Sequence, residues 1–332
     1  MPEAKGILVI GEVSEAGLTA TTKEVLGVGR RLADQLGEPL SVLLMGNLSQ
    51  AGNDAIAFGA DKVYVADNPV LASYQTDCCT AAAANLCAEI LPSILLVGQT
   101  DIGRDLAPRL AARLHTGLCM DCVELAIDPQ SRLMLMTRPV YGGNARAVRV
   151  CEKSHPQMAT VRSKSQEPLP RNDARKGEVV ACNAGVDESL VKVKVVERVK
   201  EKVTGVKLED AAVVITGGRG LGGKQGFDII RELAQVLGAA VGGSRAACEE
   251  GWLPTAQQVG LTGKIVGPNL YVAVGVSGAM QHLAGCSGSR NMVAINKDPD
   301  ANIFKVCRFG VVGDYREAMP ALVAKCRELL KG

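Results

Sequence analysis

Apolar runs alternate with segments of helical length in the first part of the chain. Four short runs rich in Val, Ile and Leu cover residues 7–10, 40–45, 62–65 and 94–97. Buried strands have this continuous apolar character, and helices between them predict a parallel sheet with crossover connections. After the fourth run, Leu106, Leu110 and Leu114 recur four residues apart, which predicts an amphipathic helix that Gly117 ends.

The same alternation returns in the second half of the chain. We expect further strand and helix units around residues 211–216, 229–237, 270–276, 292–295 and 310–312. The last residues predict an amphipathic helix, with an apolar face made of Met319, Leu322, Val323, Cys326, Leu329 and Leu330. The predicted fold class is α/β, with two open parallel-sheet domains.

The stretch between residues 163 and 210 has a different character. It begins with a polar segment that contains Pro168 and Pro170, and apolar and charged residues then alternate over residues 191–201. This alternation predicts a half-solvated strand rather than a central one. Because 332 residues suit two domains of roughly 150 residues each, we place the boundary near Thr204, between domains of residues 1–203 and 204–332.

Charge and cysteine usage narrow the class of protein. The 37 Lys and Arg residues against 35 Asp and Glu give a net charge of +2, too balanced for the basic field that nucleic-acid binding needs. No stretch approaches the ~20 apolar residues of a membrane span. The 11 cysteines lack a disulfide-framework spacing, and the N-terminal MPEAKGILVIGEV leaves no room for a signal peptide. We therefore expect a cytoplasmic protein with no nucleic-acid partner.

A glycine-rich loop, GGRGLGGKQGF at residues 217–227, directly follows an expected strand. Gly218, Gly220 and Gly223 match the G-x-G-x-x-G spacing, in which backbone N–H groups and a helix N-terminus approach a pyrophosphate. A nicotinamide site also needs an acidic residue about 20 residues further on, and residues 233–248 contain none. This favours Arg219 as a phosphate-binding cation over an ordinary NAD site; the alternative is a tight turn with a solvated arginine.

Polar side chains follow the other expected strands of the second half as well. Because the carboxyl ends of parallel strands meet at one edge, where open α/β sheets bind ligands, we expect these side chains to line one crevice. With Arg219 they are Ser244, Arg245, Thr262, Ser277, His282, Asn296 and Asp314. The crevice would suit a long ligand with a phosphate middle, an adenosine end and a polar ring end.

Three of these side chains also have structural interpretations. Ser244 would cap the short helix that follows it. Arg245 is four residues from Glu249, which is the spacing of a surface ion pair on a helix. A histidine such as His282, near an apolar helix face, is often a hydrogen-bonded core residue.

Other chemistry-bearing residues favour structural roles. Cys119 and Cys122 form C-x-x-C without a second pair, so free thiols are favoured over a metal site. Cys78 and Cys79 are interpreted as small helix residues. His115 and His155 have no Ser or Asp partners arranged for a hydrolytic triad.

Ordered motifs run through both halves of the chain. Those in the second half are GGRGL, GSRAACEEGWLP, QVGLTGK, YVAVGVSGAMQHLAG and VAINKDPDANIF, and those in the first half are GRDLAPRLAARLHTGL, TRPVYGGNARA and QMATVRSK. Through these motifs the chain resembles the alpha subunit of electron-transfer flavoproteins over nearly its whole length. The resemblance implies an N-terminal nucleotide-hydrolase-like domain that holds no nucleotide and faces a beta subunit. It also implies a C-terminal Rossmann-like domain that binds FAD.

The resemblance implies a role for each matching position. Arg219 and Ser244 would contact the pyrophosphate of FAD, Arg245 the face of the isoalloxazine ring, and Thr262 the region of flavin N5. The loop of Thr262 also contains Val259, Gly260 and Leu261. Leu261 stands where many members have Gln, which puts one side-chain contact near the ring in doubt.

The remaining positions would hold the rest of FAD. The phosphate and ribityl part would lie against Ser277, Gly278, Ala279, Met280 and Gln281. His282 would donate a hydrogen bond to flavin O2, and the adenosine would meet Asn296, Asp314 and Tyr315.

A positive charge near the isoalloxazine ring is expected to raise the first reduction potential of the flavin. A flavin that gains an electron without a proton accumulates negative charge on its N1 and O2 side, where a fixed cation or donor stabilises it. A unit charge ~4 Å away, at an effective dielectric near 20, contributes up to ~4 kcal/mol. Arg245 and His282 would thus raise the first reduction potential by on the order of 100 mV.

The function implied by the resemblance is electron transfer. The chain would pair with a beta subunit, accept electrons from flavin dehydrogenases such as the acyl-CoA dehydrogenases of fatty acid beta-oxidation, and pass them to a quinone reductase or another acceptor. The N-terminal motifs also look like the variant common in anaerobes, some of which bifurcate electrons from NADH. From a different class, a stand-alone NAD- or flavin-dependent oxidoreductase is the alternative, and the missing ribose acid counts against it.

Overall fold

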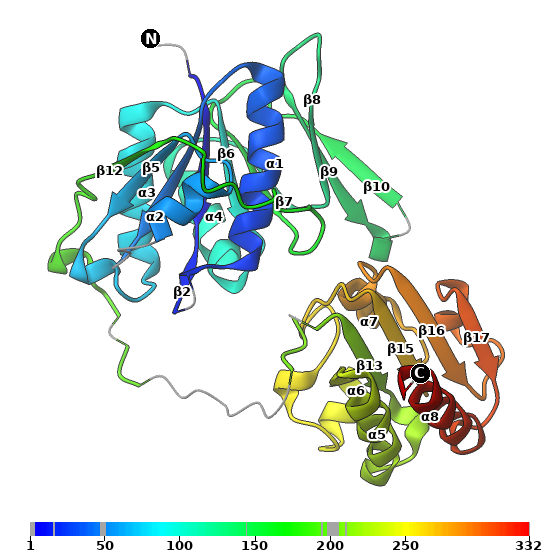
Figure 1. The fold of residues 1–332 in the computed structure, drawn as a ribbon. Helices are drawn as coiled ribbons and strands as arrows, with labels where there is room; N and C mark the ends of the chain where they lie inside the picture. Colours follow the sequence, from blue (N-terminus) through cyan, green and yellow to red (C-terminus); the bar gives the residue numbers. More distant parts are fainter. Residues whose placement is uncertain are drawn as a thin grey trace. The chain divides into compact units, whose positions relative to one another are not determined.

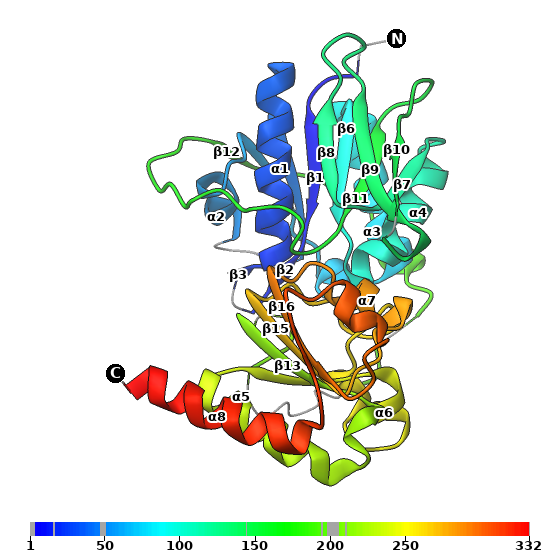
Figure 2. The same ribbon diagram turned by 90° about the vertical axis from the view of Figure 1, so that its right-hand side faces the viewer.

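The computed structural model describes residues 4–15, 17–46, 51–143, 145–193, 195–197, 206–209 and 211–331. The chain divides into two units, residues 1–198 and 199–332, which we call the N-terminal and the C-terminal unit (Figures 1 and 2). The boundary expected between residues 203 and 204 lies outside the described residues and stays a prediction.

A parallel sheet forms the centre of the N-terminal unit. Within the described ranges it has seven strands, in the order β12 (Glu178–Ala181), β5 (Lys62–Ala66), β4 (Leu40–Met45), β1 (Ile7–Gly11), β6 (Ile94–Gly98), β11 (Gln157–Val161) and β7 (Leu118–Cys122). All neighbouring pairs are parallel. The four apolar runs expected to be strands are β1, β4, β5 and β6, so these predictions are confirmed.

Helices cover both faces of this sheet. Ile7 and Val9 of β1 belong to the core on one face, with α1 (Ala20–Leu36) and α2 (Ala51–Ala57). Leu8 and Ile10 belong to the core on the other face, with α3 (Thr76–Ile90) and α4 (Asp101–Arg113). The alternation follows from the two-residue period of a strand.

Several strands of this unit have no apolar run to predict them. An antiparallel sheet contains β10 (Ala145–Arg149), β9 (Met134–Val140) and β8 (Glu124–Ile127), and a short hairpin contains β2 (Val13–Ser14) and β3 (Gly17–Leu18). The edge strands β12 and β10 are largely exposed. Exposed strands lack the hydrophobic signal on which sequence patterns depend.

Two local predictions are wrong. The helix predicted to end at Gly117 ends at Arg113, because Leu114 caps it and His115 takes the left-handed conformation with φ 52°. The alternating residues 191–193 and 195–197 form no strand. Val196 is 97% exposed there, so this alternation does not mark a half-buried surface; the remaining positions up to 201 lie outside the described residues.

The C-terminal unit contains a second parallel sheet. Its order is β14 (Ala240–Gly243), β13 (Val213–Gly217), β15 (Leu270–Val274), β16 (Asn291–Asn296) and β17 (Phe309–Val312). All four pairings are parallel. With the first sheet, this confirms the fold class of two open parallel-sheet domains.

Helices also cover both faces of the second sheet. The core on one face includes residues of α5 (Phe227–Leu237), α6 (Arg245–Glu249) and α8 (Tyr315–Lys331), and the other includes Cys286 of α7 (Met280–Cys286). The final amphipathic helix is confirmed as α8, which buries Met319 and Val323. Leu329 and Leu330 were expected on its apolar face but are 69% and 63% exposed, because the last turn extends beyond the core that α8 covers.

Short 3₁₀ turns connect several of these elements. They occupy Pro69–Leu71, Tyr141–Gly143, Glu188–Leu190, Arg219–Leu221, Lys224–Gly226, Thr255–Gln257 and Asn302–Lys305.

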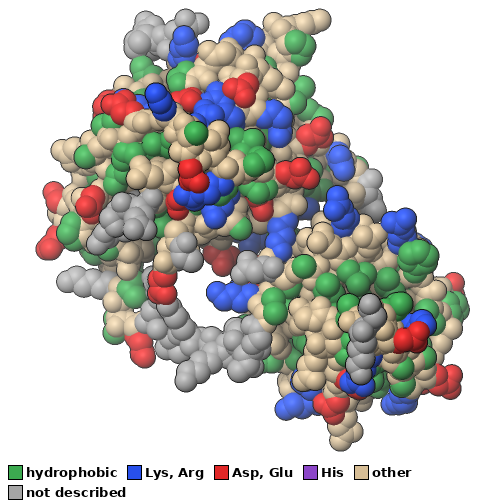
Figure 3. Space-filling view, in the orientation of Figure 1, with side chains coloured by type: hydrophobic (Ala, Val, Ile, Leu, Met, Phe, Trp, Pro, Cys, Tyr) green, Lys and Arg blue, Asp and Glu red, His purple; other side chains and the backbone are tan. Residues whose placement is uncertain are grey.

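The surface agrees with the balanced charge of the sequence. On the face drawn in Figure 3, acidic and basic side chains are interspersed on both units. Among the helices that the structure describes, none is long and apolar enough to cross a membrane.

Two backbone contacts join the loop after β13 to the end of β15. The N–H of Gly218 donates to the carbonyl oxygen of Val274, and the N–H of Gly220 to that of Gly275, both at 2.9 Å. A Cβ atom on Gly218 would lie 2.2 Å from the Gly275 oxygen. Glycine is therefore needed at residue 218 for the close approach of two backbones.

We expect Gly218→Ala to destabilise the C-terminal unit by about 1–3 kcal/mol, because the new methyl group meets a backbone oxygen. The single tryptophan, Trp252, packs edge-on against Phe227 in this unit, so its fluorescence during urea unfolding measures the effect. Gly223→Ala is the matched control, because a Cβ there meets nothing within 4 Å. Equal stability of the two variants would contradict the proposed contact.

Candidate functional site

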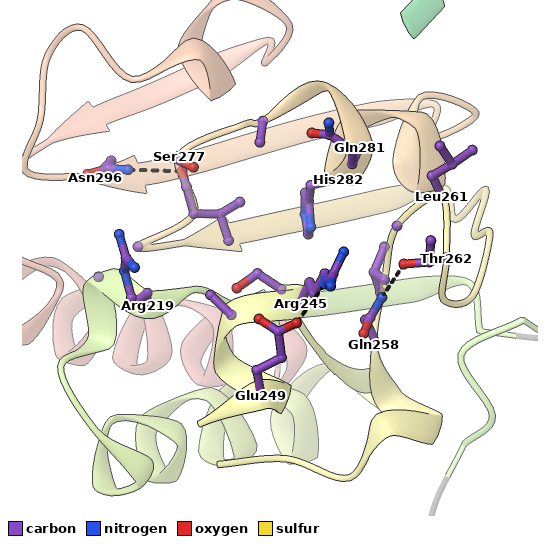
Figure 4. A pocket seen from close by; sticks show the side chains of 18 of the residues that line it. Arg219, Arg245, Glu249, Gln258, Leu261, Thr262, Ser277, Gln281, His282 and Asn296 are labelled. Atoms are coloured by element: carbon purple, nitrogen blue, oxygen red, sulfur yellow. Dashed lines mark hydrogen bonds and ion pairs between the residues drawn. The ribbon is translucent and has the colours of Figure 1, made fainter. Parts of the chain in front are cut away.

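A cavity of about 590 Å³ opens at the carboxyl edge of the C-terminal sheet (Figure 4). The loops after β13, β14 and β15 and the end of β16 supply its walls, as expected for parallel strands. Most of the predicted site residues line it: Arg219, Ser244, Arg245, Val259, Gly260, Leu261, Thr262, Ser277, Ala279, Gln281, His282 and Asn296.

A smaller cavity of about 110 Å³ continues along the same sheet edge. It shares Gly220, Gly275 and Asn296 with the larger cavity. Asp314 and Tyr315, predicted at the adenosine end, line this smaller cavity. The two cavities together cover the ends of all five strands, which suits an extended ligand.

Two predicted residues, Gly278 and Met280, line neither of these cavities. Gly278 has φ 78°, and a Cβ there would lie 2.3 Å from the backbone nitrogen of Ile303. Its role in this structure is to permit the turn after β15. The Met280 side chain is 57% exposed at the start of α7.

The glycine loop does not present its backbone as predicted. The N–H groups of Gly218 and Gly220 are used by the carbonyl oxygens at the end of β15. Two 3₁₀ turns, Arg219–Leu221 and Lys224–Gly226, lie within the loop, and α5 begins at the last residue of the loop, Phe227. The interpretation of these two N–H groups as pyrophosphate ligands is therefore wrong, and the loop instead positions Arg219.

Arg219 is an available cation. It follows the first glycine of the loop, is exposed, and lines the larger cavity. Among the described residues, its guanidinium has no hydrogen-bond or ion-pair partner. A guanidinium in this state can bind a phosphate in bidentate geometry without first breaking another interaction.

Arg245 makes the ion pair that its spacing permits. Its Nε lies 2.7 Å from Glu249 Oε1 within α6, and both side chains line the larger cavity. The two side chains are 67% and 62% exposed, and such surface pairs contribute only about 0–1 kcal/mol. The pair therefore leaves Arg245 free to move onto a ligand at small cost.

Ser244 caps α6 as predicted. Its Oγ accepts a hydrogen bond from the backbone nitrogen of Ala247 at 3.4 Å. Because the hydroxyl accepts in this contact, its own hydrogen remains able to donate toward the cavity that Ser244 lines.

The loop of Thr262 is held in place by α7. The N–H of Leu261 donates to the carbonyl oxygen of Gln281 at 2.7 Å. Gln258 is 6% exposed, and its Nε2 donates to Thr262 Oγ1 at 3.0 Å. Since Oγ1 accepts this hydrogen bond, the hydroxyl hydrogen of Thr262 is left for another acceptor.

Asn296 fixes the edge of the site at the end of β16. Its Nδ2 donates to the carbonyl oxygen of Val276 at 2.9 Å, and its Oδ1 accepts from the N–H of Asp298 at 3.1 Å. At the smaller cavity, the Tyr315 hydroxyl donates to the carbonyl oxygen of Leu221 at 2.9 Å. These side chains thus join the loops that surround both cavities.

His282 is buried and neutral. The residue is 6% exposed, and burial lowers its pKa to about 4. Its Nε2 lies 2.9 Å from the Tyr271 hydroxyl, while its buried Nδ1 has no hydrogen-bond partner. The interpretation of His282 as a hydrogen-bonded core residue therefore explains the contact of Nε2 but not the missing hydrogen bond of Nδ1. A buried nitrogen without a hydrogen bond fits a residue that contacts a ligand.

Sequence reasoning did not select Glu249, Gln258 or Asp298 as site residues, although all three line the larger cavity. Gln258 begins the motif QVGLTGK, and a polar residue beside a glycine-rich turn was the available signal. Sequence reasoning also did not select Tyr271. The available signal was a hydroxyl inside the apolar run YVAV, because a buried hydroxyl needs a hydrogen-bond partner.

The residues interpreted as structural belong to the N-terminal unit. Cys78 and Cys79 are buried residues of α3, and Cys119 and Cys122 are unpaired in β7. Within the described ranges, no group of three or more His, Cys, Asp or Glu residues could hold a metal ion.

Comparison with known proteins agrees with this geometry. The family described as "Electron transfer flavoprotein domain" matches residues 7–187, and "Electron transfer flavoprotein FAD-binding domain" matches residues 207–287. The chain is 46% identical over 330 residues to the electron transfer flavoprotein subunit alpha of Thermoanaerobacterium thermosaccharolyticum, covering 99% of this chain and 100% of that protein.

Two further relatives have names other than electron transfer flavoprotein subunit alpha. The "Acryloyl-CoA reductase electron transfer subunit beta" of Anaerotignum propionicum is 36% identical, over 98% of this chain and 96% of that protein. The "Lactate dehydrogenase (NAD(+),ferredoxin) subunit LctC" of Acetobacterium woodii is 36% identical, over 96% of this chain and 76% of that protein. Most residues that line the larger cavity fall in the range that matches the FAD-binding domain family, and the chain belongs to the electron transfer flavoprotein alpha subunit family.

Proposed function

We propose that this chain is an electron-carrier subunit that holds one FAD in its C-terminal unit and has no organic substrate of its own. The observation that carries the proposal is the composition of the larger cavity, which brings Arg219, Arg245 and the neutral His282 to one sheet edge. The acidic groups there are Glu249, which is paired with Arg245, and Asp298, which accepts the N–H of Asp300. This set suits an anionic cofactor better than acid–base catalysis on a substrate.

The residues present fit FAD. The orphaned Nδ1 of His282 and the unpartnered guanidinium of Arg219 are the groups that an acceptor-rich, phosphate-containing molecule would satisfy. When bound, FAD supplies the capacity to take up and release single electrons. The protein supplies binding, orientation and the local electrostatic field.

The predicted contacts of the residues that line the two cavities remain part of this proposal. Arg219 and the Ser244 hydroxyl would hold the pyrophosphate, and Arg245 would leave Glu249 to lie over the ring. Thr262, oriented by Gln258, would donate near flavin N5. The Nδ1 of His282 would donate to flavin O2.

The rest of the cofactor would follow the sheet edge. The ribityl chain and phosphates would lie beside the turn after β15, which contains Ser277, Ala279 and Gln281. Asn296, Asp314 and Tyr315 would meet the adenosine, which their position at the two adjoining cavities supports.

The proposed partner is an electron transfer flavoprotein beta subunit, with the N-terminal domain of residues 1–203 as the surface that faces it. The family match over residues 7–187 supports this assignment. We place the complex in the cytoplasm, which the eleven unpaired cysteines support.

For the electron donor we propose flavin dehydrogenases such as the acyl-CoA dehydrogenases of fatty acid beta-oxidation, and for the acceptor a quinone reductase. The name of the acryloyl-CoA reductase relative supports a partner that handles acyl-CoA compounds. A second candidate function is electron bifurcation from NADH, which the name of the lactate dehydrogenase relative, with NAD⁺ and ferredoxin, favours.

A stand-alone NAD-dependent oxidoreductase is less well supported. An NAD site needs an acidic residue for the ribose at the end of the second strand. Here β14 is followed by Ser244 and Arg245, and no acid occurs in residues 233–248.

Cofactor content tests the proposed function. When the full chain is produced together with its beta subunit, we expect a yellow complex with one FAD bound by this chain, measured by absorbance and extraction. One FAD plus AMP per complex would indicate a simple carrier, whereas two FAD with NADH oxidation would indicate bifurcation. A complex that stays colourless when FAD is supplied in excess would refute the proposal.

The two arginines should have separable effects. Arg245→Gln should lower the first reduction potential by up to on the order of 100 mV, because a cation beside the ring is lost. Arg219→Gln should weaken FAD binding by roughly 10–100-fold, since a charge-assisted phosphate contact contributes ~1.5–3 kcal/mol, with a smaller effect on potential. Redox titration and dilution assays measure these quantities.

Arg231→Gln is the control for both arginine variants. Arg231 also pairs with an acid on its own helix, Asp228 at 3.0 Å, but it does not line the larger cavity. If Arg245→Gln behaves like this control in the redox titration, Arg245 does not act on the ring.

A further inference from the structure

A fully buried tyrosine lies behind His282. Tyr271 belongs to β15, in the centre of the C-terminal sheet, and is 0% exposed. Its hydroxyl lies 2.9 Å from His282 Nε2, and the two rings are tilted at 58° with centroids 6.2 Å apart. The contact joins a strand in the core to the helix that borders the cavity.

Both partners of this contact are neutral. Burial keeps the pKa of Tyr271 well above its ordinary value, so the phenol retains its proton. Burial lowers the pKa of His282 to about 4, so the imidazole carries one proton at neutral pH. That single proton resides on either Nδ1 or Nε2, and the hydrogen bond made by one nitrogen sets the state of the other.

The direction of the hydrogen bond follows from acidity. Of the two neutral groups, the phenol is the stronger acid, so its O–H donates and Nε2 accepts. An accepting Nε2 carries no hydrogen, which places the imidazole proton on Nδ1. Nδ1 has no hydrogen-bond partner, although the backbone of Val259 interacts with the ring, and His282 lines the larger cavity.

We propose that Tyr271 is a positioning residue, which holds the proton of His282 on Nδ1 so that the histidine donates a hydrogen bond to the ligand of the cavity. The inference rests on the proposed function in one respect, because it takes that ligand to be FAD. Flavin O2 is an acceptor, so an Nδ1 without a hydrogen would leave two acceptors facing each other.

The structure distinguishes this role from simple packing. A phenylalanine would fill the same place in the core without the hydrogen-bond contact to His282. The hydroxyl also interacts with the side chains of Thr216 and Cys286. Without the hydroxyl, Nε2 would lose the O–H group that donates to it, and the proton could occupy either nitrogen. Because His282 lines the larger cavity and Tyr271 does not, Tyr271 would act on the ligand through His282.

The tautomer of His282 gives a direct test that does not depend on electron transfer. The chain has three histidines, and only His282 is buried. In ¹⁵N spectra of the full chain in complex with its beta subunit, the His282 signals are those lost in His282→Ala. We expect a protonated Nδ1 and an unprotonated Nε2 in the wild type, and a shift of the proton toward Nε2 in Tyr271→Phe. A wild-type histidine protonated on Nε2 would overturn the inference.

The first reduction potential tests the consequence. Tyr271→Phe should lower the equilibrium constant for adding the first electron by about tenfold, which is ~59 mV for one electron. In the His282→Ala background, Tyr271→Phe should have no further effect. The same shift in both backgrounds would overturn a role through His282, and unfolding followed by Trp252 fluorescence verifies that each variant is folded.

The two measurements together distinguish the role of Tyr271 from the placement of FAD. A tautomer shift together with a lower potential supports both the role of Tyr271 and the FAD placement. A tautomer shift with an unchanged potential in Tyr271→Phe and in His282→Ala supports control of the proton by Tyr271. That second result would overturn the placement of His282 at the flavin ring.

Discussion

The contact between the loop after β13 and the end of β15 is the constraint on which the site depends. Two backbone hydrogen bonds of 2.9 Å, from Gly218 and Gly220, hold the loop against Val274 and Gly275. This contact directs Arg219 toward the cavity on one side and sets where the chain leaves β15 on the other. A displaced loop would move both walls at once, because no side chain separates the two backbones.

The electrostatics of the site combine exposed cations with a buried neutral ring. Arg245 is 67% exposed, so water screens its charge in the structure described here. The effective dielectric falls when a ligand or a partner surface displaces that water, and the same charge then acts more strongly. His282 is already desolvated and contributes a fixed dipole instead of a charge, so the two residues tune a ligand by different means.

Sequence patterns predicted the parts of the fold that bury continuous apolar surface. The strands β1, β4, β5 and β6 are central and apolar, and their positions agree with the expected runs. The edge strands β10 and β12 are exposed, so their residues carry no such pattern. The alternation after residue 190 predicted a strand that the described residues do not form. The valines there are exposed, so the alternation does not correspond to packing against a core.

The direction of the strands was enough to predict which residues meet at the site. The hydrogen bonds within the site depend on the register between strands and could not be predicted. Parallel strands bring their carboxyl ends together, so polar residues after strands were expected to meet, and most do. Register decides the remaining details: Val274 lies opposite Gly217, so the next N–H groups bond to β15. A glycine motif in one segment does not reveal which residues of the neighbouring strand lie beside it. The same G-x-G-x-x-G spacing can bind phosphate through its backbone N–H groups. In this chain, two of those N–H groups instead bond to the end of the neighbouring strand β15.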